Sequence, residues 1–423
     1  MTRDIAAARQ WIDRARIHWD DGDVERALRC CRAALQADPE NVDALANTGT
    51  LLWVDGNNGD AERLWRTAHA LDPSHVGVLM NLAALRNDEG DVEGSLAWIG
   101  KAERLRPGHA DVVWPRSLLE LAIGDYANGW KHYEAGLGSA SMRGVGPGFK
   151  SEPWNGAPCN RLLIWHEQGF GDTLQFVRYA KLAKERATHV CVLCPAPLVA
   201  ILKSCPYVDD AVTFVDDGGF DEQISIMSLP HLFGTTVETI PAPIPYLYAD
   251  RALAEKWAQR MESNQLKVGL VWAANVRKTQ LRFSGIDGRR SVRLEALRPL
   301  QDVAGVDFYS LQKGEAAAEA KGSAVRDFMD EIDDFAGTAA IIENVDLVIS
   351  VDTSVAHLAG AMGKPVWLLS RFDACWRWLR NRPDTPWYPK ARVFGQPRPG
   401  DWPSVIATVA NELEGARASG TFS

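Results

Sequence analysis

The sequence has 423 residues, of which 46% are hydrophobic, 24% charged and 9% aromatic. This composition is typical of globular domains and excludes collagen, a mucin-like stalk and a disordered chain, while the length suggests about three structural units. Because 46 Lys and Arg stand against 55 Asp and Glu, the formal charge is −9. Such an acidic chain lacks the basic footprint that sequence-independent nucleic-acid binding needs, so we expect no nucleic-acid partner.

The N-terminal residues and the cysteines indicate a cytoplasmic protein. The stretch MTRDIAAARQWIDRARIHW contains no secretory signal, and no apolar run of the chain is long enough to predict a membrane span. The seven cysteines, an odd number, fit reduced thiols. Cys191 and Cys194 form a C-x-x-C, but residues three apart on a strand point to opposite faces, so we expect neither a zinc nor a redox site there.

A period of 34 residues organises the first third of the chain. A proline-closed period of this length is typical of tetratricopeptide repeats, in which each unit is a pair of helices with small residues where the helices approach. The fourth unit keeps its glycine but lacks the closing proline, as expected where an array meets another domain. We therefore predict an array of about four repeats over residues 1–137. The repeated positions are Gly22, Gly56, Gly90 and Gly124; Pro39, Pro73 and Pro107; Ala27, Ala61 and Ser95; and Ala34, Ala68 and Ala102.

Asn47 and Asn81 stand one repeat apart on the first helix of their units, the helix that lines the concave groove. An asparagine side chain can bond the N–H and C=O of an extended peptide at once, without reading its side chains. This pair resembles the asparagine ladder of the O-GlcNAc transferase superhelix. The alternative is that both side chains fill polar positions between repeats. In either case the groove is a candidate binding surface for a protein or peptide partner.

The pattern changes after residues 138–160, a stretch rich in Gly, Pro and Ser that predicts a linker. Apolar runs then alternate with helical stretches, which predicts parallel sheets covered on both faces. The polar segment 216–264 lacks this pattern, ends in a helix at 252–263, and fits a hinge between two α/β halves, 161–264 and 265–423. The expected strands are 161–166, 189–193, 211–214, 267–272, 307–311, 345–350 and 365–369, and a helix is expected at 173–184.

The first loop that carries chemistry leaves the strand at 161–166 and enters the helix at 173–184. It reads His166, Glu167, Gln168, Gly169, Phe170, Gly171 and Asp172. It is neither a Walker A loop nor a dinucleotide-binding fingerprint. Its glycines allow a tight turn beside a ligand. Asp172 is either an N-cap of the helix or a carboxylate exposed at the mouth of the sheet, able to take a proton from a hydroxyl.

The second loop lies between the strand at 345–350 and the helix that follows, in the sequence SVDTSVAH. Asp352 or Thr353 can cap this helix, which leaves the N–H groups after it as a site for a diphosphate favoured by the helix dipole. His357 lies one turn into the helix, on the side of Thr353. A lone helical histidine more often packs than reacts, but the neighbouring hydroxyls and the strand-end position favour a functional role here.

These loops carry a family resemblance. HEQGFGDTLQFVRY and DLVISVDTSVAHLAGAMGKPVWLL resemble the two conserved blocks of glycosyltransferase family 9, the heptosyltransferase-like enzymes, and in particular its repeat-bearing branch. The resemblance extends to Trp402 and has the repeats before it, an organisation similar to that of O-GlcNAc transferase. It implies an α-solenoid of tetratricopeptide repeats followed by a GT-B fold of two Rossmann-like α/β halves, with a closing C-terminal helix. The acceptor is then expected on the first half and the nucleotide-sugar on the second.

The resemblance also implies roles for individual residues. Gly171 and Asp172 match the family's Gly-Asp, whose aspartate is the proposed catalytic base. The family's Asp-Thr-x-x-x-His block, which holds the donor diphosphate, has Ser354 where the heptosyltransferases have Gly, which leaves the sugar open. The donor-site residues implied are Asp352, Thr353, Ser354 and His357, with Arg290 as a cation facing the phosphates and Gln312 and Lys313 as further candidates, Lys313 being alternatively a solvated strand end.

The expected reaction is inverting, metal-independent transfer of a sugar from a nucleotide-diphosphate donor to an acceptor hydroxyl. No D-x-D lies in a suitable loop, because Asp333 and Asp334 stand beside a helix start, so we expect no metal or other cofactor. The repeats favour a protein acceptor. Two alternatives stay open: a non-catalytic adaptor with a degenerate transferase half, or a heptosyltransferase-like enzyme of surface glycan assembly. Three tryptophans of CWRWLRNRPDTPWYP, at 376, 378 and 387, lie near the expected donor cleft, although packing is the simpler role for each.

Overall fold

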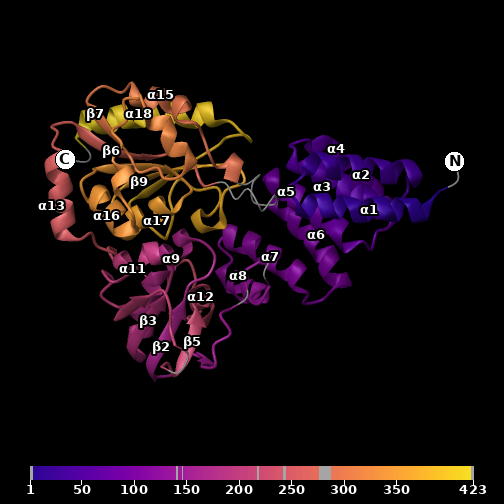
Figure 1. Cartoon of the computed structure of the whole chain (residues 1–423), viewed down its shortest axis with the longest axis horizontal. Helices are drawn as coiled ribbons and strands as arrows, with labels where there is room; N and C mark the ends of the chain where they lie inside the picture. Colours follow the sequence, from indigo (N-terminus) through magenta and orange to yellow (C-terminus); the bar gives the residue numbers. More distant parts are fainter. Residues whose placement is uncertain are drawn as a thin grey trace. The chain divides into compact units, whose positions relative to one another are not determined.

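The structure, a computed structural model, describes residues 3–139, 142–144, 146–216, 219–241, 244–275 and 287–420. The chain divides into two units (Figure 1). One consists mainly of the residues up to Leu119, and the other holds Glu120–Asn275 and Arg290–Ser423. None of the helices in these described ranges is both long and apolar enough to cross a membrane.

Paired helices with a 34-residue period form the N-terminal array. Gly22, Gly56, Gly90 and Gly124 each turn the chain at a φ of 81° to 85°, a conformation that glycine adopts without strain. The residue after each glycine is Asp or Asn, and its side chain caps the second helix of the repeat. The helices are α1 (Ile5–Asp20), α2 (Val24–Ala37), α3 (Val42–Val54), α4 (Asn58–Leu71), α5 (Val76–Asp88), α6 (Val92–Leu105), α7 (Ala110–Ala122) and α8 (Tyr126–Tyr133).

The small residues of the repeat pattern are buried, which confirms their predicted packing role. Ala27, Ala61, Ala34, Ala68 and Ala102 have no exposed surface, and Ser95 is 1% exposed. The last helix, α8, is grouped with the α/β halves rather than with the rest of the array. Its aromatic face explains this grouping, because Trp130 packs edge-on against both Phe176 and Trp376.

The first half of the second unit is built on a parallel sheet in the order β1-β5-β2-β3-β4. The predicted strands are present, with ends displaced by at most two residues. The prediction for 216–264 was wrong in part, since this segment contains β5, which pairs with β2 inside the sheet. The elements are β1 (Glu152–Pro153), β2 (Cys159–Trp165), α9 (Phe170–Phe176), α10 (Ala180–Lys184), β3 (Ala187–Leu193), α11 (Ala196–Leu202), β4 (Asp210–Val212), β5 (Glu222–Ser225), α12 (Leu229–Leu232) and α13 (Arg251–Arg260).

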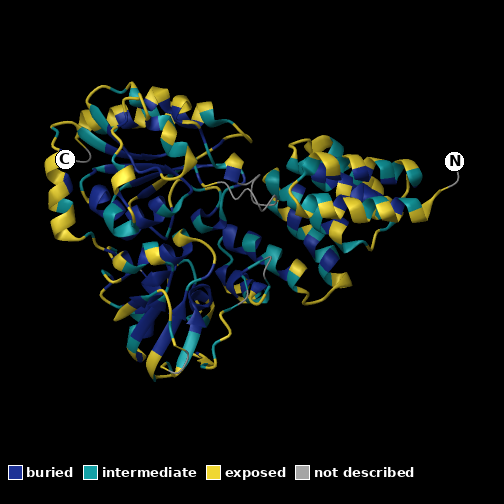
Figure 2. Cartoon of the chain, viewed as in Figure 1, coloured by how far each residue is buried: buried dark blue, intermediate teal, exposed yellow. Residues whose placement is uncertain are grey.

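The second half has a parallel sheet in the order β10-β9-β8-β6-β7. Strands β8 and β9 are buried along their whole length, whereas α13 is largely exposed (Figure 2). The elements are β6 (Leu266–Val271), α15 (Arg298–Gln301), β7 (Val306–Ser310), α16 (Phe335–Glu343), β8 (Leu347–Val351), α17 (Ser354–Ala361), β9 (Val366–Ser370), β10 (Ala391–Gly395) and α18 (Trp402–Ser419). The predicted architecture, a helical repeat solenoid followed by two Rossmann-like α/β halves, is confirmed.

Each sheet has a point at which the strand order reverses. In the first sheet, β2 has β3 on one side and β5 on the other; in the second, β6 has β7 on one side and β8 on the other. Ligands of open α/β sheets bind outside the carboxyl ends of the strands at such points. The loops after β2 and β8 lead into α9 and α17, and these two helices pack against each other. The fold therefore brings the two loops singled out in the sequence to one place.

Candidate active site

The loop after β2 turns sharply before α9. Gln168 has a φ of 61°, and Gly169 is the N-cap of the helix. The helix begins at Phe170, not at 173 as predicted, because the Asp172 carboxylate accepts a hydrogen bond from the N–H of the N-cap residue, Gly169, at 2.9 Å. Asp172 is thus the third residue of the helix rather than its N-cap. One carboxylate oxygen, Oδ2, serves the backbone, and Oδ1 points away from it.

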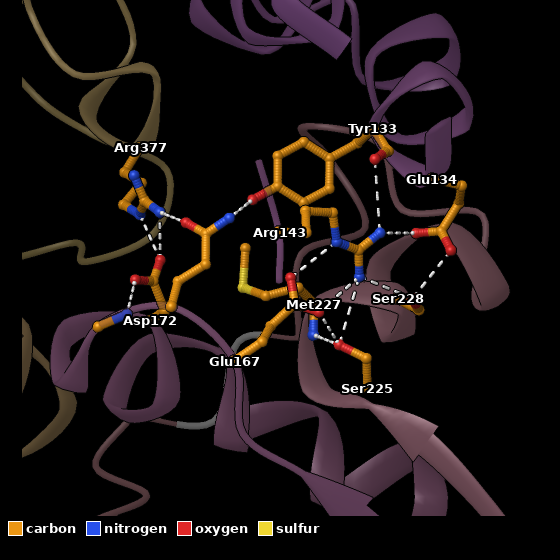
Figure 3. A network of polar contacts seen from close by, with 11 residues as sticks. Tyr133, Glu134, Arg143, Glu167, Asp172, Ser225, Met227, Ser228 and Arg377 are labelled. Carbon is orange, nitrogen blue, oxygen red and sulfur yellow. Dashed lines mark hydrogen bonds and ion pairs between the residues drawn. The ribbon is translucent and has the colours of Figure 1, made fainter. Parts of the chain in front are cut away.

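Asp172 Oδ1 forms an ion pair with Arg377, which comes from the short helical turn at Trp376–Trp378 after β9 (Figure 3). Arg377 Nε donates to this oxygen at 2.7 Å, and Nη2 also donates to it. The two side chains are only 10% and 14% exposed. Burial lowers the pKa of Arg377, but the charge of Asp172 together with the neighbouring Cys375 and Tyr133 raises it more, and the net direction is upward. Arg377 is therefore a permanent cation beside the predicted base.

A second layer of buried polar groups supports this loop (Figure 3). Arg143, with no exposed side-chain surface, bonds both oxygens of Glu167 at 2.7 and 3.0 Å. Burial raises the pKa of Glu167 in spite of this pairing. Gln168 donates to the hydroxyl of Tyr133 on α8 at 2.7 Å. Glu167 and Gln168 thus fix the loop in place. The remaining partners of Arg143 are the C=O of Tyr133 and the side chains of Glu134, Ser225 and Ser228.

His166 is the first residue of the loop. Its N–H donates to the C=O of Leu193 at 2.9 Å, which continues the pairing of β2 with β3, and burial lowers the pKa of its imidazole. His166 is therefore neutral at neutral pH.

Asp352 follows β8 directly and is held from two sides. Trp378 Nε1 donates to its Oδ1 at 2.8 Å, and Arg290 Nη1 donates to its backbone C=O at 3.1 Å. Burial raises the pKa of Asp352, but the charges of Arg290 and Arg371 and the hydrogen bond from Trp378 together lower it more, so the net direction is downward and the side chain is a carboxylate. The structure thus brings Asp352 and Arg290 together as the sequence predicted.

Helix α17 begins beside Asp352. Thr353 is its N-cap but makes no capping hydrogen bond through its side chain; its hydroxyl lies 3.0 Å from that of Ser350. Ser354 is the first helical residue. His357 is buried, stacks on Trp378 at 4.7 Å between ring centroids, and has Nδ1 3.0 Å from the hydroxyl of Tyr388. Burial lowers the pKa of His357 to about 4, so it is neutral at neutral pH.

The two loops meet at Gly171. A Cβ at this position would lie 2.9 Å from Cδ2 of His357 and 3.5 Å from Cα of Ser354. Only a residue without a side chain allows the start of α9 to come this close to the start of α17. Asp172 on one half and the N-terminus of α17 on the other are therefore neighbours, at the carboxyl ends of both sheets.

Gln312 and Lys313 hold the protein's own backbone. The amide oxygen of Gln312 accepts from the N–H groups of Trp272 and Ala273 at 3.1 and 2.9 Å, and its amide nitrogen donates to the C=O of Ala273 at 2.9 Å. Lys313 donates through Nζ to the backbone C=O groups of Met329 and Ile332. These contacts fix the loops after β6 and before α16.

The asparagine pair lies on the array. Asn47 is exposed on α3, and Asn81 is half-buried on α5, where it donates to the hydroxyl of Thr50 on α3 at 3.1 Å. This bond links the first helices of adjacent repeats. Asn81 therefore serves an inter-repeat contact, while Asn47 presents its amide at the surface.

Sequence reasoning missed Arg377, the cation closest to the predicted base, and noted Trp378 only as an aromatic. A signal was present in CWRWLRN, where two arginines alternate with aromatic and apolar residues outside any regular element. The backbone gives a second signal. Across the described ranges, non-glycine residues with positive φ occur only at Gln168, Ala374, Leu379 and Asn381, all in the two segments that meet at Asp172. Such strain gathers at functional sites.

Other predictions concern the cysteines and metals. Cys191 and Cys194 are buried free thiols whose pKa values are raised by burial, to about 11 and about 12. No group of three or more His, Cys, Asp or Glu in the described part of the chain is arranged to hold a metal ion. Trp154 of the linker is buried, packs edge-on against Phe233 and donates to the C=O of Ala157, and it thereby anchors the linker.

Comparison with known proteins supports the repeats directly. Residues 12–65 and 47–110 match the family model of the tetratricopeptide repeat. Protein FlbA of Caulobacter vibrioides is 26% identical over 440 aligned residues, which cover 93% of this chain and 70% of that protein. The repeat family thus accounts for the array.

Two solved structures of glycosyltransferases resemble the chain in fold. The O-GlcNAc transferase of Thermobaculum terrenum is 15% identical, with 100% of this chain and 92% of that chain covered and a TM-score of 0.39. The ADP-heptose lipopolysaccharide heptosyltransferase II of E. coli is 14% identical, with 60% and 98% covered and a TM-score of 0.44.

Proposed function

We propose that the protein is an inverting glycosyltransferase that moves a sugar from a nucleotide-diphosphate donor to an acceptor hydroxyl. The observation that carries this proposal is the meeting of Asp172 with the N-terminus of α17 at the carboxyl ends of two parallel sheets. A carboxylate suited to take a proton thus lies in the loop that adjoins a helix end suited to hold an anion.

The donor diphosphate would bind where α17 begins. The N–H groups of the first turn, including that of Ser354, and the dipole of the helix favour a negatively charged group there. Arg290, which already bonds the C=O of Asp352, supplies a positive charge at the same end of the sheet. Because His357 is neutral at neutral pH, its contribution would be a hydrogen bond or a packing surface rather than a charge.

The chemistry transfers one proton and one electron pair. Asp172 takes the proton of the acceptor hydroxyl, whose oxygen forms a bond to the anomeric carbon of the donor. The bond from that carbon to the phosphate oxygen breaks, and its electron pair leaves with the nucleoside diphosphate. The transition state is oxocarbenium-like. Negative charge grows on the leaving group, so the end of α17 and Arg290 would stabilise the transition state more than the bound substrate.

The same groups make a metal ion unnecessary in this proposal, because they supply the positive charge that a metal would bring to the diphosphate. The acceptor would be a protein or peptide bound in the groove of the repeats. We place the reaction in the cytoplasm, since the free and mostly buried cysteines fit a reducing compartment.

The test uses ADP-, GDP-, UDP- and dTDP-sugars in a thermal-shift assay, followed by release of nucleoside diphosphate from the donor that raises the melting temperature. Asp172→Asn is expected to lower turnover by about 10²-fold or more without weakening donor binding, because the proton acceptor is removed and the donor site is left intact. Activity is expected to survive EDTA. The control is Asp250→Asn, since Asp250 caps α13 at an exposed site without chemistry.

Three results would contradict the proposal. Unchanged turnover in the Asp172→Asn variant would reduce Asp172 to a helix cap. Loss of activity in EDTA with recovery in Mn²⁺ would replace the metal-free mechanism. Absence of any shift across the four donors would favour an adaptor that uses the α/β halves as a scaffold.

A further inference from the structure

The predicted base is neutralised in the structure by a residue of the donor-binding half. Asp172 Oδ1 is bonded twice by Arg377, and Oδ2 accepts from Gly169, so both oxygens have partners. Because Oδ1 already accepts two hydrogen bonds from the buried guanidinium of Arg377, it has no lone pair left to take the proton of an acceptor hydroxyl. Proton transfer from an acceptor hydroxyl therefore requires that at least one hydrogen bond from Arg377 to Asp172 break.

Arg377 lies close to the expected diphosphate site. The next residue, Trp378, bonds Asp352 and stacks on His357, so two consecutive residues contact the aspartates of both loops. Asp172 itself follows Gly171, where a Cβ would lie 3.5 Å from the Cα of Ser354 at the start of α17. Arg377 and Trp378 thus connect the loop that carries the base with the loop that leads into α17.

The segment that carries Arg377 is strained on both sides. Ala374, Leu379 and Asn381 have φ values of 40°, 60° and 56°, and a side chain disfavours each of these conformations. A segment of this kind keeps its position only through its contacts. When a ligand changes the partner of Arg377, part of that constraint is released.

Arg377 also has a neutral second partner. Its Nη2 donates to Gln168 Oε1 at 3.3 Å, and Gln168 is fixed by Tyr133 on α8. Trp376 lies under the guanidinium at 4.3 Å. These contacts allow the guanidinium to stay in the site when the bond to Asp172 is given up.

We propose, on the basis of the proposed function, that Asp172 and the donor diphosphate compete for the guanidinium of Arg377. Without donor, Arg377 pairs with Asp172, and Asp172 cannot accept a proton from the acceptor. With donor, the diphosphate draws the guanidinium to itself, and Asp172 is freed to accept a proton. Arg377 is then a positioning residue that couples donor binding to activation of the base.

The experiment is a double-mutant cycle on the full chain, measured by calorimetric titration with ADP, GDP, UDP and dTDP. Asp172→Asn is expected to tighten binding of the recognised nucleoside diphosphate by roughly tenfold, because the guanidinium no longer has to leave a carboxylate. In the Arg377→Gln background the same substitution only removes the negative charge of an unpaired carboxylate. The gain in affinity for the nucleoside diphosphate is then expected to be clearly smaller. A binding readout separates this effect from any loss of turnover.

Equal gains in the two backgrounds would overturn the inference and leave the proposed function standing. Absence of binding to all four nucleotides by the wild-type chain and every variant would overturn both. Arg377→Lys, which keeps the charge but not the two-pronged bond, is expected to give an intermediate gain and serves if Arg377→Gln folds poorly. The control pair is Arg298→Gln with Asp302→Asn, an exposed ion pair on α15, which should change no affinity.

Discussion

His357 shows how burial fixes the state of a single side chain. It lies between Trp378 and Tyr388, and burial lowers the pKa of its imidazole to about 4. The ordinary value in an unfolded chain is about 6.5. Between these two values the unfolded chain binds a proton that the folded chain does not. The free energy of unfolding therefore rises with pH across this window. The contribution of His357 to it is lost progressively as the pH falls from about 6.5 to about 4.

We expect His357→Gln to remove this part of the pH dependence. The free energy of unfolding of the wild-type chain should fall from pH 6.5 towards 4 with a contribution from this residue of at most about 1.4 kcal/mol per pH unit. Urea unfolding of the wild-type chain and of His357→Gln at matched pH values measures the difference. Burial also lowers the pKa values of His69 and His166, but both residues are present in the two proteins and contribute equally to their pH dependence. Parallel pH profiles would show that His357 titrates normally in the folded chain.

At the scale of elements, the helices and strands that follow from regular spacing could be predicted. Features that depend on tertiary contacts could not. The repeats and the apolar strands follow from local spacing. Strand β5 was missed because its first residues, Glu222 and Gln223, are polar; Gln223 is accommodated by a hydrogen bond from Trp165 Nε1 at 2.6 Å, a contact that local spacing does not reveal. The start of α9 was misplaced for a related reason. Gly169 and Gly171 indicate a loop, whereas the hydrogen bond from the N–H of Gly169 to the Asp172 carboxylate begins the helix earlier.

The approach of α9 to α17 gives a prediction at this scale. In Gly171→Ala the new Cβ would meet the buried ring of His357 at 2.9 Å, and that ring is held by Trp378 and Tyr388. We expect a loss of stability of about 1–3 kcal/mol. Turnover should fall by roughly 10²-fold, because a shift of the base by a fraction of an ångström misplaces it relative to the donor. Nucleotide-diphosphate release and urea unfolding measure the two effects.

The control is Gly415→Ala in the interior of α18, where a Cβ meets nothing within 4 Å. This change is expected to stabilise the chain by up to about 1 kcal/mol and to leave turnover unchanged. Wild-type turnover in Gly171→Ala would mean that the two helix ends need not touch for the reaction.

At the scale of the whole molecule, the candidate site combines stretches that are remote in sequence. Asp172 and Arg377 are 205 positions apart, and Tyr133 on α8 contributes from a third stretch. The motifs predicted Asp172 and Asp352, since each follows a strand in a recognisable block. They did not predict Arg377 or Trp378, because these act through proximity that the fold creates. Gln312 and Lys313, chosen for their position at a strand end, are used by the backbone instead.

The repeats lead to a prediction that concerns the acceptor. Asn47 is exposed on α3, and Asn81 joins α3 to α5 through Thr50, so both belong to first helices of their repeats. If this surface binds a protein acceptor, Asn47→Ala combined with Asn81→Ala should raise the acceptor KM while release of nucleotide in the absence of acceptor stays unchanged. The reason is that backbone hydrogen bonds to a bound segment are lost and the donor site is left intact. Asn58→Ala, at an exposed position on the second helix of a repeat, is the matched control. Equal KM values in all three proteins would assign the array to assembly, and the acceptor would then have to be recognised by the α/β halves alone.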